Sequence, residues 1–116
     1  MGNLYYNKKN IILEDTIIEP DNWVFKENRN VMVISTKSII ERKCPILSVW
    51  HDADDGMWQF LDSSDVDEGD AVLISLEEIV NLDISISEIS DLPLGWVAWR
   101  KEKGDVWKKQ EQNDAI

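Results

Sequence analysis

The chain has 116 residues, of which 43% are hydrophobic and six are Trp, and its formal net charge is −11 at pH 7. This length and apolar content are typical of one folded domain and exclude a disordered chain. The negative charge argues against DNA, RNA and anionic lipid as direct partners, because all three are polyanions.

We expect a single domain over 1–116, with 1–30 as an N-terminal extension and 110–116 as a frayed tail. Cys44 is the only cysteine, so the fold needs no disulfide and no oxidising compartment. No apolar run resembles a signal-peptide core or reaches the roughly 20 residues of a membrane helix. The sequence therefore predicts a cytoplasmic protein, although a protein exported without a leader would look the same.

The charge is unevenly distributed along the chain. All twelve basic residues lie in 1–43 or 100–116, and the stretch between them carries thirteen carboxylates. Two interpretations remain open: a solvated surface kept soluble by repulsion, or an acidic face that steers a basic partner.

The first strong structural signals follow a less readable N-terminal part. Val31–Ile34 is a continuous apolar run, as expected of a strand covered on both faces. A short helix is predicted over Lys37–Lys43, with Ser35 or Thr36 as its N-cap and Pro45 as its end.

A hairpin is predicted next, with strands over 46–51 and 57–61 joined by the turn-forming residues of 52–56. A symmetrical register would place Trp50 opposite Trp58, and Ser48 opposite Phe60 on the same face. Both Trp50 and Trp58 are then expected in the core.

The C-terminal half predicts a strand over 71–74, then a helix from Ser75 through Leu82. Ser75 and Glu78 have the spacing of a capping box. A second short helix to Ser90 and a hairpin of 96–100 with 106–108 follow. Trp96 and Trp99 should face opposite sides of their strand. The order of elements predicts an α+β fold: a mostly antiparallel sheet with two or three short helices packed on it.

The loop after the first hairpin strand is the most suggestive segment for chemistry. His51, Asp52 and Asp54 offer a weak candidate set for a divalent cation, although the spacing does not fit an EF-hand. His51 is also a candidate general base beside a carboxylate. The plainer alternatives are an acidic hairpin loop, a structural His51 and a buried, inert Cys44. Phosphate-binding glycine loops and Cys-x-x-Cys pairs are missing, so we expect no cofactor.

Three segments together resemble a known bacterial family. They are Pro45–Leu47 with Trp50–Leu61, then Val72–Ile79, then Asp91–Arg100. The family is described as immunity-protein-33-like, formerly a domain of unknown function, and the resemblance covers roughly 31–107. It brings no catalytic residue and no cofactor. It implies a binder that neutralises a toxin. The first thirty residues fall outside the resemblance, and a separate binding specificity in that part stays an open alternative.

Our leading hypothesis from the sequence is a non-catalytic interaction domain, of the immunity type, that binds a basic protein through an acidic face. The candidate contact residues are Asp52, Asp54, Asp55, Trp58, Asp65 and Asp67. One alternative is a small enzyme or metal-binding domain centred on His51, and another is a structural domain without partner chemistry. The sequence does not predict an oligomeric state.

Overall fold

The structure is a computed structural model that describes residues 22–62 and 68–112. Its strands are β2 (Met32–Thr36), β3 (Ser48–His51), β4 (Trp58–Leu61), β5 (Ala71–Ser75), β6 (Trp96–Trp99) and β7 (Lys108–Glu111). Its helices are α1 (Lys37–Ile40) and α2 (Leu76–Leu82), with 3-10 turns η2 (Glu68–Asp70) and η3 (Ile84–Ile89).

The six strands form one sheet in the order β5-β2-β4-β3-β6-β7. Both expected hairpins are present, as the antiparallel pairs β3–β4 and β6–β7. The return strand β7 begins at Lys108 rather than at 106, and it includes 110–111, which were expected to belong to a frayed tail. β2, however, lies parallel to β4, with Ile34 beside Gln59. The α+β expectation is therefore confirmed, but the sheet is mixed rather than mostly antiparallel, because the chain crosses over between these two strands.

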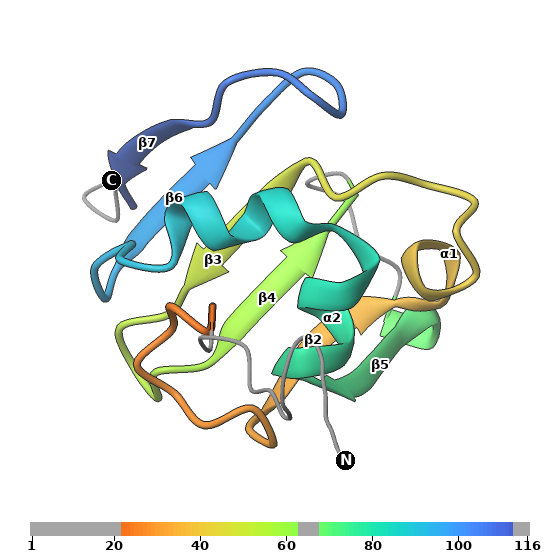
Figure 1. Cartoon of the computed structure of the whole chain (residues 1–116), viewed down its shortest axis with the longest axis horizontal. Coiled ribbons are helices and arrows are strands. Elements are labelled where there is room, and N and C mark those ends of the chain that lie inside the picture. Colours follow the sequence, from red (N-terminus) through yellow and green to blue (C-terminus); the bar gives the residue numbers. More distant parts are fainter. Residues whose placement is uncertain (1–21, 63–67, 113–116) are drawn as a thin grey trace, which may run out of the picture.

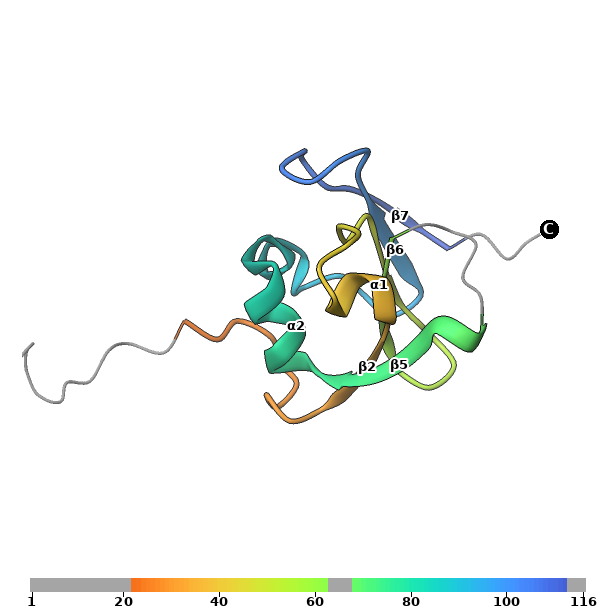
Figure 2. The same cartoon turned by 90° about the vertical axis from the view of Figure 1, so that its right-hand side faces the viewer.

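The helical segments gather on one face of the sheet. Figure 1 shows α2 and η3 in front of the strands, and Figure 2, turned by 90°, shows them on one side of the sheet. The core lies between these layers: Val49 and Phe60 from the sheet and Ile79 and Ile86 from the helices are fully buried. Of the described residues, no helical segment lies across the opposite face of the sheet, which we call the free face.

The helix starts follow from local side-chain chemistry. The Ser75 hydroxyl accepts a hydrogen bond from Glu78 N at 3.1 Å, and the Glu78 carboxylate accepts one from Ser75 N at 3.4 Å. This confirms the predicted capping box of α2. Thr36 is the N-cap of α1, since its side-chain oxygen accepts from Ile39 N at 3.2 Å. The helix ends at Ile40, before the predicted end at Lys43.

The first hairpin differs from the predicted register by one residue. His51 is opposite Trp58 and Trp50 is opposite Gln59. The loop is closed by Asp52 and Met57 and ends in Gly56 at φ 76°, a left-handed conformation that suits glycine. Because side chains alternate along a strand, this shift leaves Trp58 in the core and turns Trp50 to the free face.

The described part of the predicted N-terminal extension belongs to the core. Phe25 is 5% exposed and packs edge-on against Trp58, at 5.3 Å between ring centroids. Trp23 packs against the same cluster. Residues 22–30 therefore close one end of the core without forming a helix or strand.

Candidate interaction surface

The acidic loop between β3 and β4 is held by its own hydrogen bonds. Asp52 carboxylate accepts from the Gln59 side-chain amide at 2.6 Å, and Asp55 carboxylate accepts from Met57 N at 2.9 Å. Asp54 and Asp55 are exposed, whereas Asp52 is partly buried. Their charges are thus presented to solvent on a fixed backbone.

A hollow of about 400 Å³ lies beside this loop. Asp52, Asp54 and Asp55 form one side of it, and Glu111 of β7 contributes a fourth carboxylate. The lining also includes Leu94, Gly95 and Gln112. No basic residue is in this lining, so the hollow is strongly acidic.

The free face of the sheet is rich in apolar side chains. One row crosses all six strands and runs Leu73, Ile34, Gln59, Trp50, Val97, Gln110. Leu73 is 63% exposed, and Trp50 is partly exposed. In the neighbouring row Trp99 lies opposite Ser48.

A second hollow, of about 380 Å³, is present on the free face. Trp50, Val97 and Trp99 give it apolar walls, and Asp62 contributes a carboxylate. The remaining lining residues are Leu47, Ser48, Arg100 and Gln110. We call this the Trp50–Trp99 hollow.

Trp50 is the surface residue that the sequence analysis missed, because the assumed register placed it in the core. The signal available was the polar Ser48, which lies two residues earlier in β3 and therefore on the same face. Its hydroxyl accepts a hydrogen bond from the Trp50 indole N–H at 3.2 Å. Trp96 and Trp99 do face opposite sides of β6, as predicted: Trp96 packs against the core and Trp99 lines the hollow.

The central negative charge is less concentrated than its position in the sequence suggests. Arg29, Arg100 and Lys109, all from the two ends of the chain, pair with central carboxylates. The pairs are Arg29–Glu77 at 2.9 Å, Arg100–Asp83 at 2.6 Å and Lys109–Asp91 at 3.9 Å. Asp52, Asp54 and Asp55 do not belong to these three pairs, so their loop keeps its negative charge.

Trp58 does not offer its surface to a partner. It is 1% exposed, stacks on His51 with a centroid distance of 3.9 Å, and donates its indole N–H to Glu27 at 2.9 Å. The prediction that Trp58 is an aromatic anchor for a partner is therefore wrong, because its side chain is buried. Asp65 and Asp67 lie outside the described residues.

The contacts of His51 are those of a structural residue. Its Nδ1 lies 2.7 Å from the Leu92 carbonyl oxygen, and its Nε2 lies 3.8 Å from Glu27 Oε2. It faces the core, whereas Asp52 faces the Gln59 side chain on the free face. Over 22–62 and 68–112, no group of three or more His, Cys, Asp or Glu side chains is arranged to hold a metal ion.

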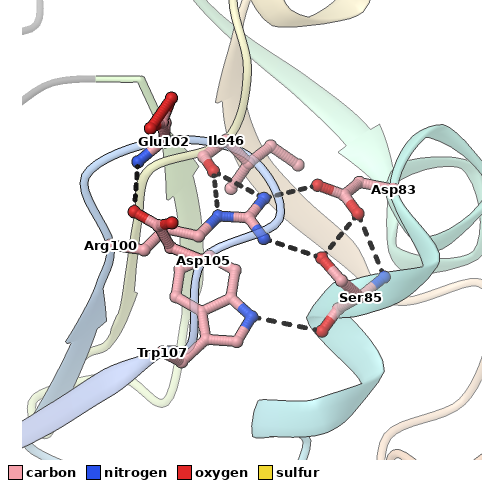
Figure 3. A network of polar contacts seen from close by, with 7 residues as sticks. All are labelled: Ile46, Asp83, Ser85, Arg100, Glu102, Asp105 and Trp107. Atoms are coloured by element: carbon pink, nitrogen blue, oxygen red, sulfur yellow. Dashed lines mark hydrogen bonds and ion pairs between the residues drawn. The ribbon is translucent and has the colours of Figure 1, made fainter.

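A buried polar network ties β6 to the helical layer (Figure 3). Arg100 donates to the Ile46 carbonyl oxygen, the Ser85 hydroxyl and the Asp83 carboxylate, and its guanidinium lies 4.1 Å from the centre of the Trp107 ring. Burial on its own would raise the pKa of Asp83. The hydrogen bonds from Ser85 and Arg100 lower this pKa by more, so that it lies below its ordinary value.

Cys44 is partly exposed, and its surroundings do not favour a nucleophilic thiol. A hydrogen bond to the Asp62 carboxylate raises the pKa of its thiol, and desolvation adds to this shift. A thiol with a raised pKa is a poor nucleophile at neutral pH, because only the thiolate reacts.

The helices of the described residues include none that is long and apolar enough to span a membrane. No family model, curated protein or solved structure matches this chain. The candidate surface therefore consists of the Asp52–Asp55 loop and the Trp50–Trp99 hollow, and its assignment rests on the chain's own geometry.

Proposed function

We propose that this chain is a non-catalytic protein-interaction domain of the immunity type, which inhibits a basic toxin by binding to it. The observation that carries the proposal is the free face of the sheet. It presents partly exposed Trp50 and Trp99 next to a loop with three carboxylates. Partly exposed tryptophans are frequent anchors at protein interfaces.

The two parts of this surface have different roles in the proposed mechanism. The carboxylates of Asp52, Asp54 and Asp55 attract the basic partner during diffusion and so raise the association rate. The tryptophans then lose water on docking and slow dissociation. The resemblance to immunity-protein-33-like domains supports a toxin as the partner, since it implies neutralisation by binding.

The acidic loop is tested with a partner captured by the full chain from a lysate of its source organism and then purified. In the triple variant Asp52→Asn, Asp54→Asn, Asp55→Asn, we expect slower association and a weaker dependence of the on-rate on salt, measured by surface plasmon resonance. A matched control, Glu88→Gln with Asp91→Asn and Glu102→Gln, changes the net charge equally at other sites.

The control variant should keep an on-rate close to that of the unmodified chain. An on-rate that is unchanged by the loop substitutions, or lowered equally by both triple variants, would reject steering by this loop.

A further inference from the structure

Arginine, tryptophan and a carboxylate occur together twice within this molecule. The Arg29 guanidinium carbon lies 4.7 Å from the centre of the Trp23 ring, and its Nη1 lies 2.9 Å from Glu77. In the same way Arg100 lies over Trp107 at 4.1 Å and pairs with Asp83 at 2.6 Å. A planar guanidinium suits both contacts, because it stacks on an aromatic ring while its edge donates to a carboxylate.

The Trp50–Trp99 hollow contains the same components without the arginine. Two tryptophans and the Asp62 carboxylate line it, and this carboxylate also accepts a hydrogen bond from the Cys44 thiol. Arg100 also belongs to the lining, but its guanidinium is already bound to Asp83 and to the Ile46 carbonyl oxygen. Within the described ranges, the only arginine outside the two internal triads is Arg42, which lines a different hollow beside Cys44.

The size and charge of the hollow fit a side chain from another molecule. Its volume of about 380 Å³ exceeds what a single guanidinium and its methylene stem need. The chain carries a net charge of −11, and Asp52, which begins the Asp52–Asp55 loop at the end of β3, contacts Gln59 on the free face. A basic protein drawn to this face would therefore bring its cations close to the two rings.

We propose that the Trp50–Trp99 hollow receives an arginine side chain of the basic partner, with its guanidinium against the indole rings and paired with Asp62. This inference rests on the proposed function, because it names the group that the free face recognises. It assigns specificity to the hollow and leaves the long-range attraction to the Asp52–Asp55 loop.

The test is a titration of the full-length chain with N-acetyl-arginine amide, followed by NMR of the tryptophan indole N–H signals. These signals are assigned with Trp50→Phe and Trp99→Phe. We expect saturable shifts at Trp50 and Trp99, and no shift at Trp23 or Trp107, whose rings are already covered. N-acetyl-citrulline amide, which has the same shape without the charge, should bind at least about threefold more weakly.

Asp62→Asn should weaken binding of the arginine probe by about threefold or more, whereas the matched control Glu88→Gln on η3 should not. Spectra of both variants without the probe establish that they are folded. Equal binding of the arginine and citrulline probes, or no effect of Asp62→Asn, would overturn the proposal. So would shifts of Trp50 and Trp99 on raising the protein concentration alone, because a second copy would then occupy the face.

This outcome is separable from that of the proposed function. A chain that captures a partner through the Asp52–Asp55 loop but ignores the arginine probe refutes only the arginine assignment. A chain that binds the arginine probe while no loop-dependent partner exists refutes the proposed function and leaves the arginine site standing.

Discussion

Arg100 and Asp83 form the most deeply buried ion pair among the described residues. Their side chains are 1% and 8% exposed, and hydrogen bonds from Ser85 and to Ile46 satisfy the remaining polar atoms. A buried pair of this kind is costly to break, because the surviving partner keeps its charge in a poorly solvated place. The pair therefore holds β6, which carries Trp99, against the helical layer.

Replacing Asp83 with Asn should lower the free energy of unfolding by about 3–5 kcal/mol, since Arg100 would then be buried without a counter-charge. Urea denaturation measures this loss. The control is Asp91→Asn at the exposed Lys109–Asp91 pair, which should cost less than about 1 kcal/mol. Similar losses in both variants would contradict the view that burial makes Asp83 important.

Stability should also fall in acid because of Asp83. Its pKa is lower in the folded state than in the unfolded chain, so the unfolded state takes up the proton first. The stabilisation is complete above the unfolded-state pKa of about 3.9 and is lost as the pH falls through the folded-state value. Urea midpoints measured over pH 2–6 should drop more steeply for the unmodified chain than for Asp83→Asn; parallel curves would contradict this linkage.

The reactivity of Cys44 should depend on Asp62, whose carboxylate holds the thiol in its protonated form. In Asp62→Asn, we expect faster alkylation by iodoacetamide at pH 8, because more thiolate is present. Glu88→Gln provides a control with the same change in net charge. Equal alkylation rates in the unmodified chain and Asp62→Asn would show that the carboxylate does not govern this thiol.

At the scale of elements, the sequence predicted those parts that depend on local chemistry. The helix after Ser75 is present because its capping box needs only residues that are three apart. The apolar runs over 31–34 and 71–74 predicted the presence of β2 and β5. The expectation that 31–34 is covered on both faces is wrong, because Met32 is 47% exposed; on the neighbouring β5, Leu73 is 63% exposed.

Pairing between strands was harder to predict, because it depends on contacts that are distant in sequence. Nothing local indicates that β2 lies parallel to β4. The hairpin register depended on whether the loop closes at Asp52 and Met57, and an error of one residue moved Trp50 to the wrong face. The acidic loop was therefore found from the sequence, whereas the Trp50–Trp99 hollow was not.

The segment before β2 is attached to the core through Glu27. Glu27 accepts from the Trp58 indole N–H at 2.9 Å, and its backbone carbonyl accepts from the Trp23 indole N–H at 2.9 Å. The side-chain contact fixes residues 22–30 against Trp58, which in turn stacks on His51.

Glu27→Ala should lower the free energy of unfolding by about 1–3 kcal/mol, because it leaves the Trp58 N–H without its acceptor. Glu27→Gln keeps an amide oxygen in place and should lose less. Urea denaturation compares the two variants, and hydrogen exchange should become faster over 22–31 in Glu27→Ala. Equal stability of the Ala and Gln variants would contradict a role for the acceptor.

At the scale of the whole molecule, the two faces of the sheet carry different side chains. The helical face encloses the core, including the Arg100 network, and Ile84 of η3 is 70% exposed. The free face carries Leu73, Trp50 and Trp99 and borders the acidic loop. One face therefore accounts for stability, and the other is the face that we propose for recognition.

The most direct test of this division is an NMR cross-saturation experiment on the labelled chain bound to its purified partner. We expect loss of signal at the Trp50 and Trp99 indoles and at the Leu73 methyl groups, while the exposed Ile84 methyl groups keep full intensity. Loss of signal at Ile84 with unchanged Trp50, Trp99 and Leu73 would show that the partner binds the helical face and would contradict the account.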